Sequence, residues 1–266
     1  MPTSRILENG VKARAARGER SYGVLFPWVA PDLVELFGHA GFDWLFIDAE
    51  HGCIGRESCE ILVRACNVVG MTPIVRVPEA REPVILSYLE AGALGLIVPH
   101  INTADDAREA VAATQYGPAG HRGACSTSRI ANYGVTQTPN EYFAAANNEI
   151  TVIALIEEKE GLDNLDQILA VEGLFGVSIG PGDLAMSMGL PGQIDHPDVQ
   201  RAVQDAQRRV VASGKVLSTC IADASGKSTQ KFADVGSLMI GVRAATMLGT
   251  MGRQFLEDAK GGASAC

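Results

Sequence analysis

The segment FDWLFIDAEHG, residues 42–52, holds the side chains best suited to acid–base chemistry. Its apolar run is followed within four positions by Asp48, Glu50 and His51, and then by a glycine. Short, continuous apolar runs are typical of strands buried on both faces, so the three ionisable groups should lie at the carboxyl end of a parallel strand. Proteins with parallel sheets keep their active sites at that edge. His51 is therefore a candidate proton acceptor, and a hydrogen bond that merely fixes the loop is its alternative role.

Polar side chains also end three later apolar runs. Arg76 lies near the end of one, Glu157 ends another, and Asp183 follows the next in the sequence GPGDL. Neighbouring parallel strands lie about 4.8 Å apart, so carboxylates at two adjacent strand ends can share one cation. Oxygen ligands completed by water and substrate favour Mg²⁺ or Mn²⁺, with Co²⁺ or Zn²⁺ as further possibilities. We predict that Glu157 and Asp183 are metal ligands; the alternative for Glu157 is an ion pair with a nearby Arg or Lys.

Two features could hold a small anion beside this cation. Arg76 stands between two prolines, a placement that makes a fixed guanidinium available to an anionic oxygen, although an ion pair within the site is equally compatible with it. The backbone N–H groups of Gly182 and Asp183 could bind a carboxylate. Together these groups describe a site for a small oxo acid.

The elements that must position these residues follow a regular alternation. Eight strands alternate with helices at intervals of about 30 residues, the length of a βα repeat. We predict the α/β class, with residues 1–266 forming one (β/α)8 TIM barrel domain whose carboxyl strand ends collect His51, Arg76, Glu157 and Asp183 in one mouth. Strands are expected at 22–28, 42–48, 72–78, 96–98, 151–157, 174–180, 216–221 and 238–242. Helices are expected at 1–18, 31–38, 57–69, 83–90, 105–115, 140–146, 161–170, 197–212, 225–233 and 244–260.

The composition of the chain argues against membrane and nucleic-acid partners. A chain of 266 residues suits a single barrel, and no apolar run approaches the roughly 20 residues of a membrane span. A net charge of −9 without a basic stripe disfavours nucleic acid, because binding phosphates needs clustered Lys and Arg. The first residues lack the apolar core of a secretion signal, so we expect a cytoplasmic protein with no membrane partner.

Other catalytic classes find little support. A Schiff base needs a lysine inside the barrel, but all six lysines fall in predicted helices, loops or a strand start (residues 12, 159, 215, 227, 231 and 260). The GPGDLA sequence superficially fits a dinucleotide-binding turn, but its proline and the lack of an acidic strand end about 20 residues later count against it. We expect reduced, mostly buried thiols at the six cysteines, and nothing around Cys53 marks it as a nucleophile.

Six short segments, taken in order, resemble the HpcH/HpaI aldolase family, which are metal-dependent, pyruvate-forming class II aldolases. The resemblance runs from about Gly23 to Gly241, and its segments are specific jointly rather than singly. It implies a (β/α)8 barrel, usually a homohexamer built from pairs of subunits that exchange the last helix. The segments are Asp48-Ala-Glu-His-Gly52, Pro73-Ile-Val-Arg76, Gly92-Ala-Leu-Gly-Leu-Ile-Val-Pro99, Gly120-His-Arg-Gly123, Ile156-Glu157 and Gly180-Pro-Gly-Asp-Leu184.

The resemblance also implies roles for individual positions. His51 matches the family's base, Arg76 the residue that stabilises the enolate, and Glu157 and Asp183 the metal ligands. Gly182 matches a small residue whose amide holds the pyruvate carboxylate. Glu90 matches an acidic residue that raises the basicity of the histidine, and Asp48 belongs with the catalytic candidates. Many members carry glutamine where this chain has Leu155, a substrate-facing position where leucine offers no hydrogen bond.

The implied reaction is reversible aldol cleavage of a 4-hydroxy-2-oxo acid to pyruvate and an aldehyde. His51 would take the proton from the 4-hydroxyl, while the metal and Arg76 would stabilise the enolate. An oxaloacetate decarboxylase or an acyl-CoA lyase is the closest alternative. A barrel that binds a ligand without catalysis is a more remote one.

Overall fold

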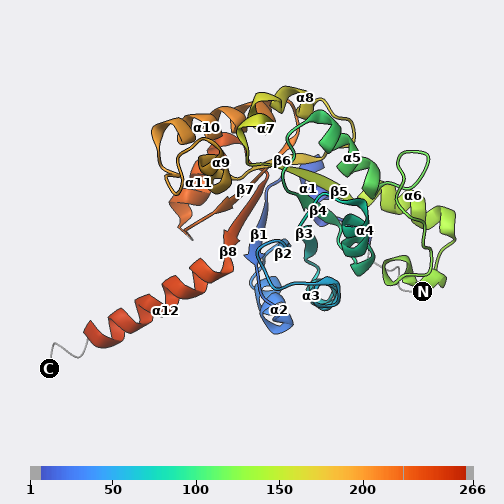
Figure 1. Cartoon of the computed structure of the whole chain (residues 1–266). Coiled ribbons are helices and arrows are strands. Elements are labelled where there is room, and N and C mark those ends of the chain that lie inside the picture. The colour runs from blue at the N-terminus through green and yellow to red at the C-terminus, as the bar shows by residue number, and fades with distance from the viewer. Residues whose placement is uncertain (1–6, 224, 262–266) are drawn as a thin grey trace.

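The computed structural model of the chain describes residues 7–223 and 225–261, and its centre is a closed barrel (Figure 1). Eight parallel strands pair in chain order, and the last pairs with the first. The predicted (β/α)8 architecture is thus confirmed. The strands are β1 (Ser21–Phe26), β2 (Trp44–Asp48), β3 (Thr72–Arg76), β4 (Gly95–Val98), β5 (Thr151–Ile156), β6 (Gly176–Ile179), β7 (Val216–Ile221) and β8 (Met239–Arg243).

Helices surround the barrel, and most begin and end within one residue of the predicted bounds. They are α1 (Gly10–Ala16), α2 (Pro31–His39), α3 (Arg56–Val69), α4 (Glu82–Ala91), α5 (Ala104–Thr114), α6 (Pro139–Glu149), α7 (Lys159–Asp163), α8 (Leu165–Leu169), α9 (Pro181–Ser187), α10 (Pro197–Ala212), α11 (Gly226–Val235) and α12 (Ala244–Gly261), with a 3₁₀ segment η2 (Arg129–Gly134) in the long loop. The first six residues of the expected helix at 1–18 lie outside the described residues.

The helix α9 was not predicted. Its sequence, PGDLAMS, reads as a turn because of its glycine, yet Pro181 occupies the first helical position, where its fixed φ and missing N–H are no disadvantage. The helix expected at 161–170 is instead the pair α7 and α8. They meet at Asn164, whose backbone leaves the helical region (φ −95°, ψ 5°).

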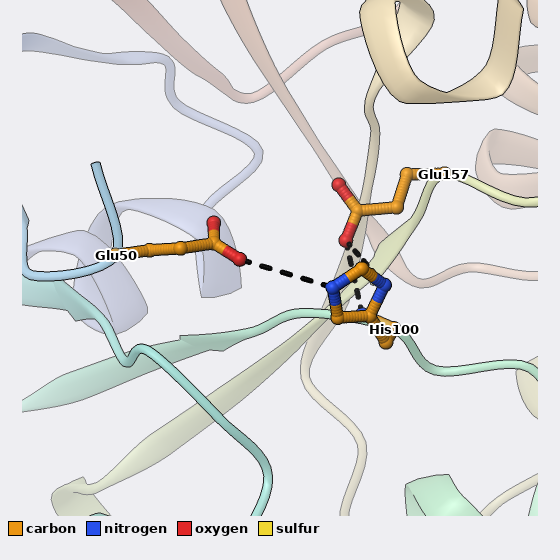
Figure 2. A group of neighbouring side chains, drawn as sticks. All are labelled: Glu50, His100 and Glu157. Atoms are coloured by element: carbon orange, nitrogen blue, oxygen red, sulfur yellow. Dashed lines mark hydrogen bonds and ion pairs between the residues drawn. The ribbon is translucent and has the colours of Figure 1, made fainter. Parts of the chain in front are cut away.

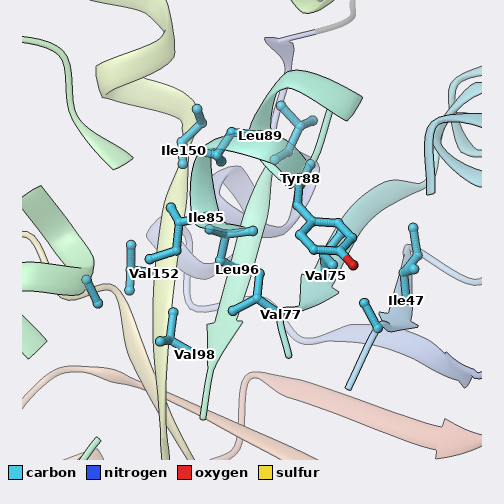
Figure 3. Packing of buried hydrophobic residues seen from close by; sticks show 14 of the residues in the cluster. Ile47, Val75, Val77, Ile85, Tyr88, Leu89, Leu96, Val98, Ile150 and Val152 are labelled. Carbon is cyan, nitrogen blue, oxygen red and sulfur yellow. The ribbon is translucent and has the colours of Figure 1, made fainter. Parts of the chain in front are cut away.

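Strand periodicity assigns each residue to one face of the barrel. Trp44, Ile74, Ile153 and Met239 pack together inside it, and Val11 of α1 joins them. The residues between them face outward and pack under the helices. Figure 3 shows this outer layer where Ile85, Tyr88 and Leu89 of α4 cover Val75, Leu96, Val98 and Val152 of three strands. Because side chains alternate along a strand, the inward set continues at the carboxyl ends as Asp48, Arg76 and Arg243.

The helix α12 departs from the barrel wall and projects away from it (Figure 1). It leaves four large apolar side chains exposed: Leu248, Met251, Phe255 and Leu256. None of the described helices is both long and apolar enough to cross a membrane.

Candidate active site

Asp48 and Arg76 form a two-pronged ion pair at the carboxyl ends of β2 and β3. The Arg76 Nε and Nη2 atoms donate to the two carboxylate oxygens of Asp48 at 3.0 and 2.7 Å. Burial acts to raise the pKa of Asp48, but the hydrogen bonds and charge of Arg76 outweigh it and hold that pKa below its usual range. Such a planar, bidentate pair fixes the direction of the guanidinium.

Glu50 is a second carboxylate partner of Arg76. Its Oε2 atom lies 3.0 Å from Nη1 of Arg76, and both side chains are largely buried. The ring of Phe46 lies below, 5.6 Å from the guanidinium carbon. The ion pair that the sequence analysis gave as an alternative role of Arg76 therefore exists. It fixes the position of the arginine side chain, which stays at the mouth of the barrel.

His51 follows this pair in the loop after β2, with its side chain 64% exposed. Its backbone N–H donates to Oδ1 of Asp48 at 3.1 Å, which fixes the start of the loop. The ring Nε2 lies 3.8 Å from Oε2 of Glu50, too far for a hydrogen bond. The imidazole thus borders the mouth and remains available to accept a proton from a ligand.

Glu157 is the most buried carboxylate of the site, only 3% exposed. The backbone N–H of His100 donates to its Oε1 at 3.0 Å. Burial foremost raises the pKa of Glu157, and the nearby carboxylates of Glu50 and Asp183 raise it further. A buried carboxyl that resists ionisation alone is well suited to a cation, because a positive charge restores its ionised form.

His100 was not among the candidate site residues. It lies two residues after β4 in the left-handed backbone region (φ 55°), and its Nδ1 lies 2.9 Å from Oε1 of Glu158. Burial acts to lower the pKa of His100, but Glu158, Glu157 and Glu50 together raise it above its usual range. A single histidine after a proline gives no spacing that marks a site, so only the fold shows its place.

Glu50, His100 and Glu157 converge from three strand ends (Figure 2). One possible ligand atom from each lies within 4.8 Å of the others, so the three could hold a metal ion. Asp183 is not in this group. It is exposed in the first turn of α9, near enough to Glu157 to affect its pKa. Glu157 is thus common to the predicted ligand pair and to the observed group.

Gly180 brings α9 close to Glu157. A Cβ atom at Gly180 would lie 2.9 Å from Cβ and 3.1 Å from Oε2 of Glu157, closer than real side chains pack. The other oxygen of Glu157 is the one that His100 binds, so Oε2 is turned toward the loop that leads to Asp183. The N–H groups of Gly182 and Asp183 lie in the first turn of α9, where helical N–H groups have no partner within the helix.

Glu90 lies apart from the histidine. Nη2 of Arg122 donates to its Oε1 at 3.0 Å, and the fully buried Arg122 stacks 4.4 Å from the ring centre of Tyr116. Glu90 is on the last turn of α4, whereas His51 follows β2, and no hydrogen bond or ion pair between described residues joins them. Its predicted effect on the basicity of His51 stays a prediction.

Leu155 faces the barrel interior, next to the inward set of β5, and is 5% exposed. Its Cδ1 atom is 3.5 Å from where a Cβ of Gly180 would lie. The side chain therefore forms an apolar wall below the loop that carries Gly182 and Asp183.

The lysines lie outside the barrel strands, and the described cysteines differ in exposure. All six lysines lie in described residues and outside the eight strands, as expected; Nζ of Lys215 bonds to two backbone carbonyls before β6. Cys59 and Cys66 are buried as expected, but Cys220 is only partly buried and Cys53 and Cys125 are exposed. Cys266 lies outside the described residues. Position in the fold, rather than the apolar sequence around a cysteine, decides its exposure.

Comparison with known proteins identifies the family. Residues 22–247 match the family model of HpcH/HpaI aldolase/citrate lyase. The chain belongs to the HpcH/HpaI aldolase family. It is 37% identical over 211 residues to a 2-keto-3-deoxy-L-rhamnonate aldolase of Escherichia coli O157:H7, a match that covers 79% of this chain and 78% of the relative.

Solved structures agree with this membership. An HpcH/HpaI aldolase/citrate lyase family protein from Burkholderia cenocepacia J2315 superposes with a TM-score of 0.89 at 31% identity, over 95% of this chain and 99% of the other. The HpcH/HpaI aldolase from Desulfitobacterium hafniense DCB-2 gives a TM-score of 0.86 at 27% identity, over 94% and 96%. This HpcH/HpaI aldolase is accordingly a carbon–carbon lyase that cleaves a keto acid in a metal-dependent aldol reaction.

Proposed function

We propose that the chain reversibly cleaves a 4-hydroxy-2-oxo acid to pyruvate and an aldehyde. The arrangement of Arg76 and Glu157 supports the proposal: one wall of the mouth presents a fixed guanidinium, and the other a buried carboxylate with one oxygen facing Gly180, three residues before Asp183. An exposed imidazole, that of His51, lies beside Glu50, the carboxylate that also contacts Arg76. The 2-keto acid named for the E. coli relative supports the substrate class.

Glu157 and Asp183 would hold the divalent ion, with Glu50 and His100 beside it. The donor set fits Mg²⁺ or Mn²⁺, because it is mainly carboxylate oxygen and the mouth leaves room for substrate and water. Co²⁺ or Zn²⁺ would gain from the imidazole of His100. When bound, the ion supplies Lewis-acid polarisation of the 2-oxo group.

The residues of the chain supply binding and proton transfer. The free N–H groups of Gly182 and Asp183 would hold the carboxylate of the substrate, against the apolar wall of Leu155. Arg76, which Asp48 and Glu50 fix in direction, would donate a hydrogen bond to the 2-oxo oxygen as negative charge develops there. His51 would accept the proton of the 4-hydroxyl group, and that transfer releases the aldehyde.

A pyruvate-release assay on several substrates tests the proposal. With Mg²⁺ or Mn²⁺ the enzyme should release pyruvate from 4-hydroxy-2-oxo acids, and excess chelator should abolish the release until metal is restored. Borohydride added with pyruvate should trap no lysine adduct, because no lysine lies on a barrel strand. Full activity in chelator, or a pyruvyl mass increment on a lysine, would contradict the mechanism. Turnover of oxaloacetate alone would make the protein a decarboxylase instead.

We also propose that subunits pair by exchanging α12. The helix exposes Met251 and Phe255, and where it leaves the barrel the surface has an apolar hollow of about 180 Å³ lined by residues that include Phe42, Ile240 and Met247. A second copy's helix laid across this region would bury both surfaces. Cytoplasmic location and the absence of nucleic-acid and membrane partners stay predictions.

Removing the exposed apolar groups of α12 should therefore dissociate the oligomer. The double variant Met251→Glu, Phe255→Glu should elute and scatter light as a smaller species than the wild type, which we expect to be a hexamer. Replacing Arg253 by Glu, on the same helix, is the control and should leave the assembly unchanged. A wild-type monomer would refute the exchange.

A further inference from the structure

The loop that carries His51 is held firmly where it begins. Residues 49–55 connect β2 to α3, and the backbone N–H groups of Glu50 and His51 both donate to Oδ1 of Asp48, at 3.3 and 3.1 Å. The chain then turns back sharply, because a Cβ atom at Gly52 would lie 2.2 Å from the carbonyl oxygen of Asp48. Only glycine allows so close an approach of two backbone segments. The end of β2 therefore fixes the direction in which the loop leaves the strand.

Tyr88 of α4 holds the other end of this loop. Its hydroxyl group donates a hydrogen bond of 3.1 Å to the carbonyl oxygen of Ile54. Both residues are buried, and the tyrosine ring belongs to the apolar layer under α4 (Figure 3). Burial foremost raises the pKa of Tyr88, so the hydroxyl stays protonated and remains a donor. Within residues 7–223 and 225–261, no other side chain donates to the backbone of residues 52–54, so this end of the loop depends on one buried hydroxyl group.

The imidazole of His51 lies between these two points of attachment. Its ring makes no hydrogen bond with the described residues, since Nε2 is 3.8 Å from Oε2 of Glu50, so the backbone of the loop sets its position. A general base must lie within about 2.6–3.2 Å of the atom whose proton it accepts. A misplacement of about 1 Å can cost about 10²-fold in rate. Movement of the loop at Ile54, three residues along the chain, would therefore weaken proton transfer to His51.

We propose that Tyr88 is a positioning residue: by binding the carbonyl group of Ile54, it sets the distance between His51 and the 4-hydroxyl group of the substrate. The inference rests on the proposed function, because Tyr88 would act through His51. Removal of the tyrosine hydroxyl leaves a buried carbonyl without a partner, which favours movement of the loop toward water. The groups expected to hold pyruvate lie at the carboxyl ends of β3, β5 and β6, so pyruvate binding should not depend on Tyr88.

The variant Tyr88→Phe tests the proposal, because it removes the hydroxyl group and keeps the ring. It should lower kcat for aldol cleavage about tenfold, a part of the loss that a 1 Å displacement can cause. The Kd for pyruvate should stay within about twofold of wild type, and oxaloacetate decarboxylation should slow much less. In the His51→Ala background, Tyr88→Phe should cause no further loss of aldol cleavage, because the two residues act in series. The matched control is Thr114→Val, which removes a buried hydroxyl that donates to a backbone carbonyl on α5 and should leave every rate unchanged.

Amide hydrogen exchange measures the attachment of the loop without turnover. Exchange in a peptide that covers residues 49–55 should be faster in Tyr88→Phe than in the wild type, and Thr114→Val should leave it unchanged. Unchanged exchange in Tyr88→Phe would overturn the proposal, as would full aldol activity of that variant when His51→Ala is inactive. A further tenfold loss in the His51→Ala background would overturn it as well, since Tyr88 would then act by another route. Full activity of His51→Ala would instead refute the proposed base, and the exchange rates would still decide whether Tyr88 holds the loop.

Discussion

Replacing His51 with alanine should lower aldol cleavage by about 10²–10⁴-fold, the usual contribution of a general base. The imidazole is exposed at the mouth, and its ring makes no hydrogen bond with the described residues, so its loss should leave the fold intact. Steady-state kinetics with a 4-hydroxy-2-oxo acid measure the loss. Pyruvate binding by the variant should stay within about twofold of wild type, because the groups expected to hold pyruvate lie at the carboxyl ends of β3, β5 and β6.

Oxaloacetate provides the internal control for this prediction. Its decarboxylation requires no proton from a 4-hydroxyl group, so His51→Ala should slow it much less than aldol cleavage. His39→Ala, an exposed histidine at the end of α2, should change neither rate. An equal loss of rate in both reactions would show that His51 maintains the shape of the site instead of accepting the substrate proton. Unchanged aldol cleavage would show that His51 only fixes its loop.

Strand ends were predictable from the sequence because the signals are local. An apolar run followed by Asp48, or by Glu157, is visible without a structure, and closure of eight βα units then places both at one mouth. The strand β7 and the helix α10 have the predicted bounds, since each lies between clear breaks in pattern. The local periodicity of apolar residues was therefore sufficient to predict the fold and the main strand ends around the site.

Pairings across the mouth were not predictable in this way. The contact between Arg76 and Glu50 depends on how the loop after β2 turns, and the place of His100 depends on its left-handed backbone. The partnership of Glu90 with Arg122 joins residues 32 positions apart through the long loop after α5. Each of these contacts arises from tertiary packing, so no residue spacing in the sequence predicts it.

The position of Glu157 creates a conflict between stability and function. The side chain is 3% exposed and close to the carboxylates of Glu50 and Asp183, so its ionised form is costly in the metal-free protein. A pKa raised above the unfolded value means that this carboxyl contributes stability below its unfolded pKa and loses it as pH rises through the folded pKa. Above its folded pKa, Glu157 in the metal-free protein therefore carries a charge that the fold opposes, and a bound divalent ion would offset that cost.

Glu157→Gln should consequently abolish function while stabilising the metal-free protein. Metal-dependent pyruvate release should fall by at least about 10²–10³-fold. The neutral amide of glutamine does not attract the divalent ion, and the arrangement of groups that the bound ion supports is then lost. In chelator at pH 8 the melting temperature should rise by roughly 2–4 °C, as expected for about 1 kcal/mol in a domain of this size. The gain should shrink as pH falls toward 4, where wild-type Glu157 is protonated, and Mg²⁺ should raise the melting temperature of the wild type only. A variant that melts lower than wild type in chelator at pH 8 would show that the ionised carboxylate is paired well enough without metal.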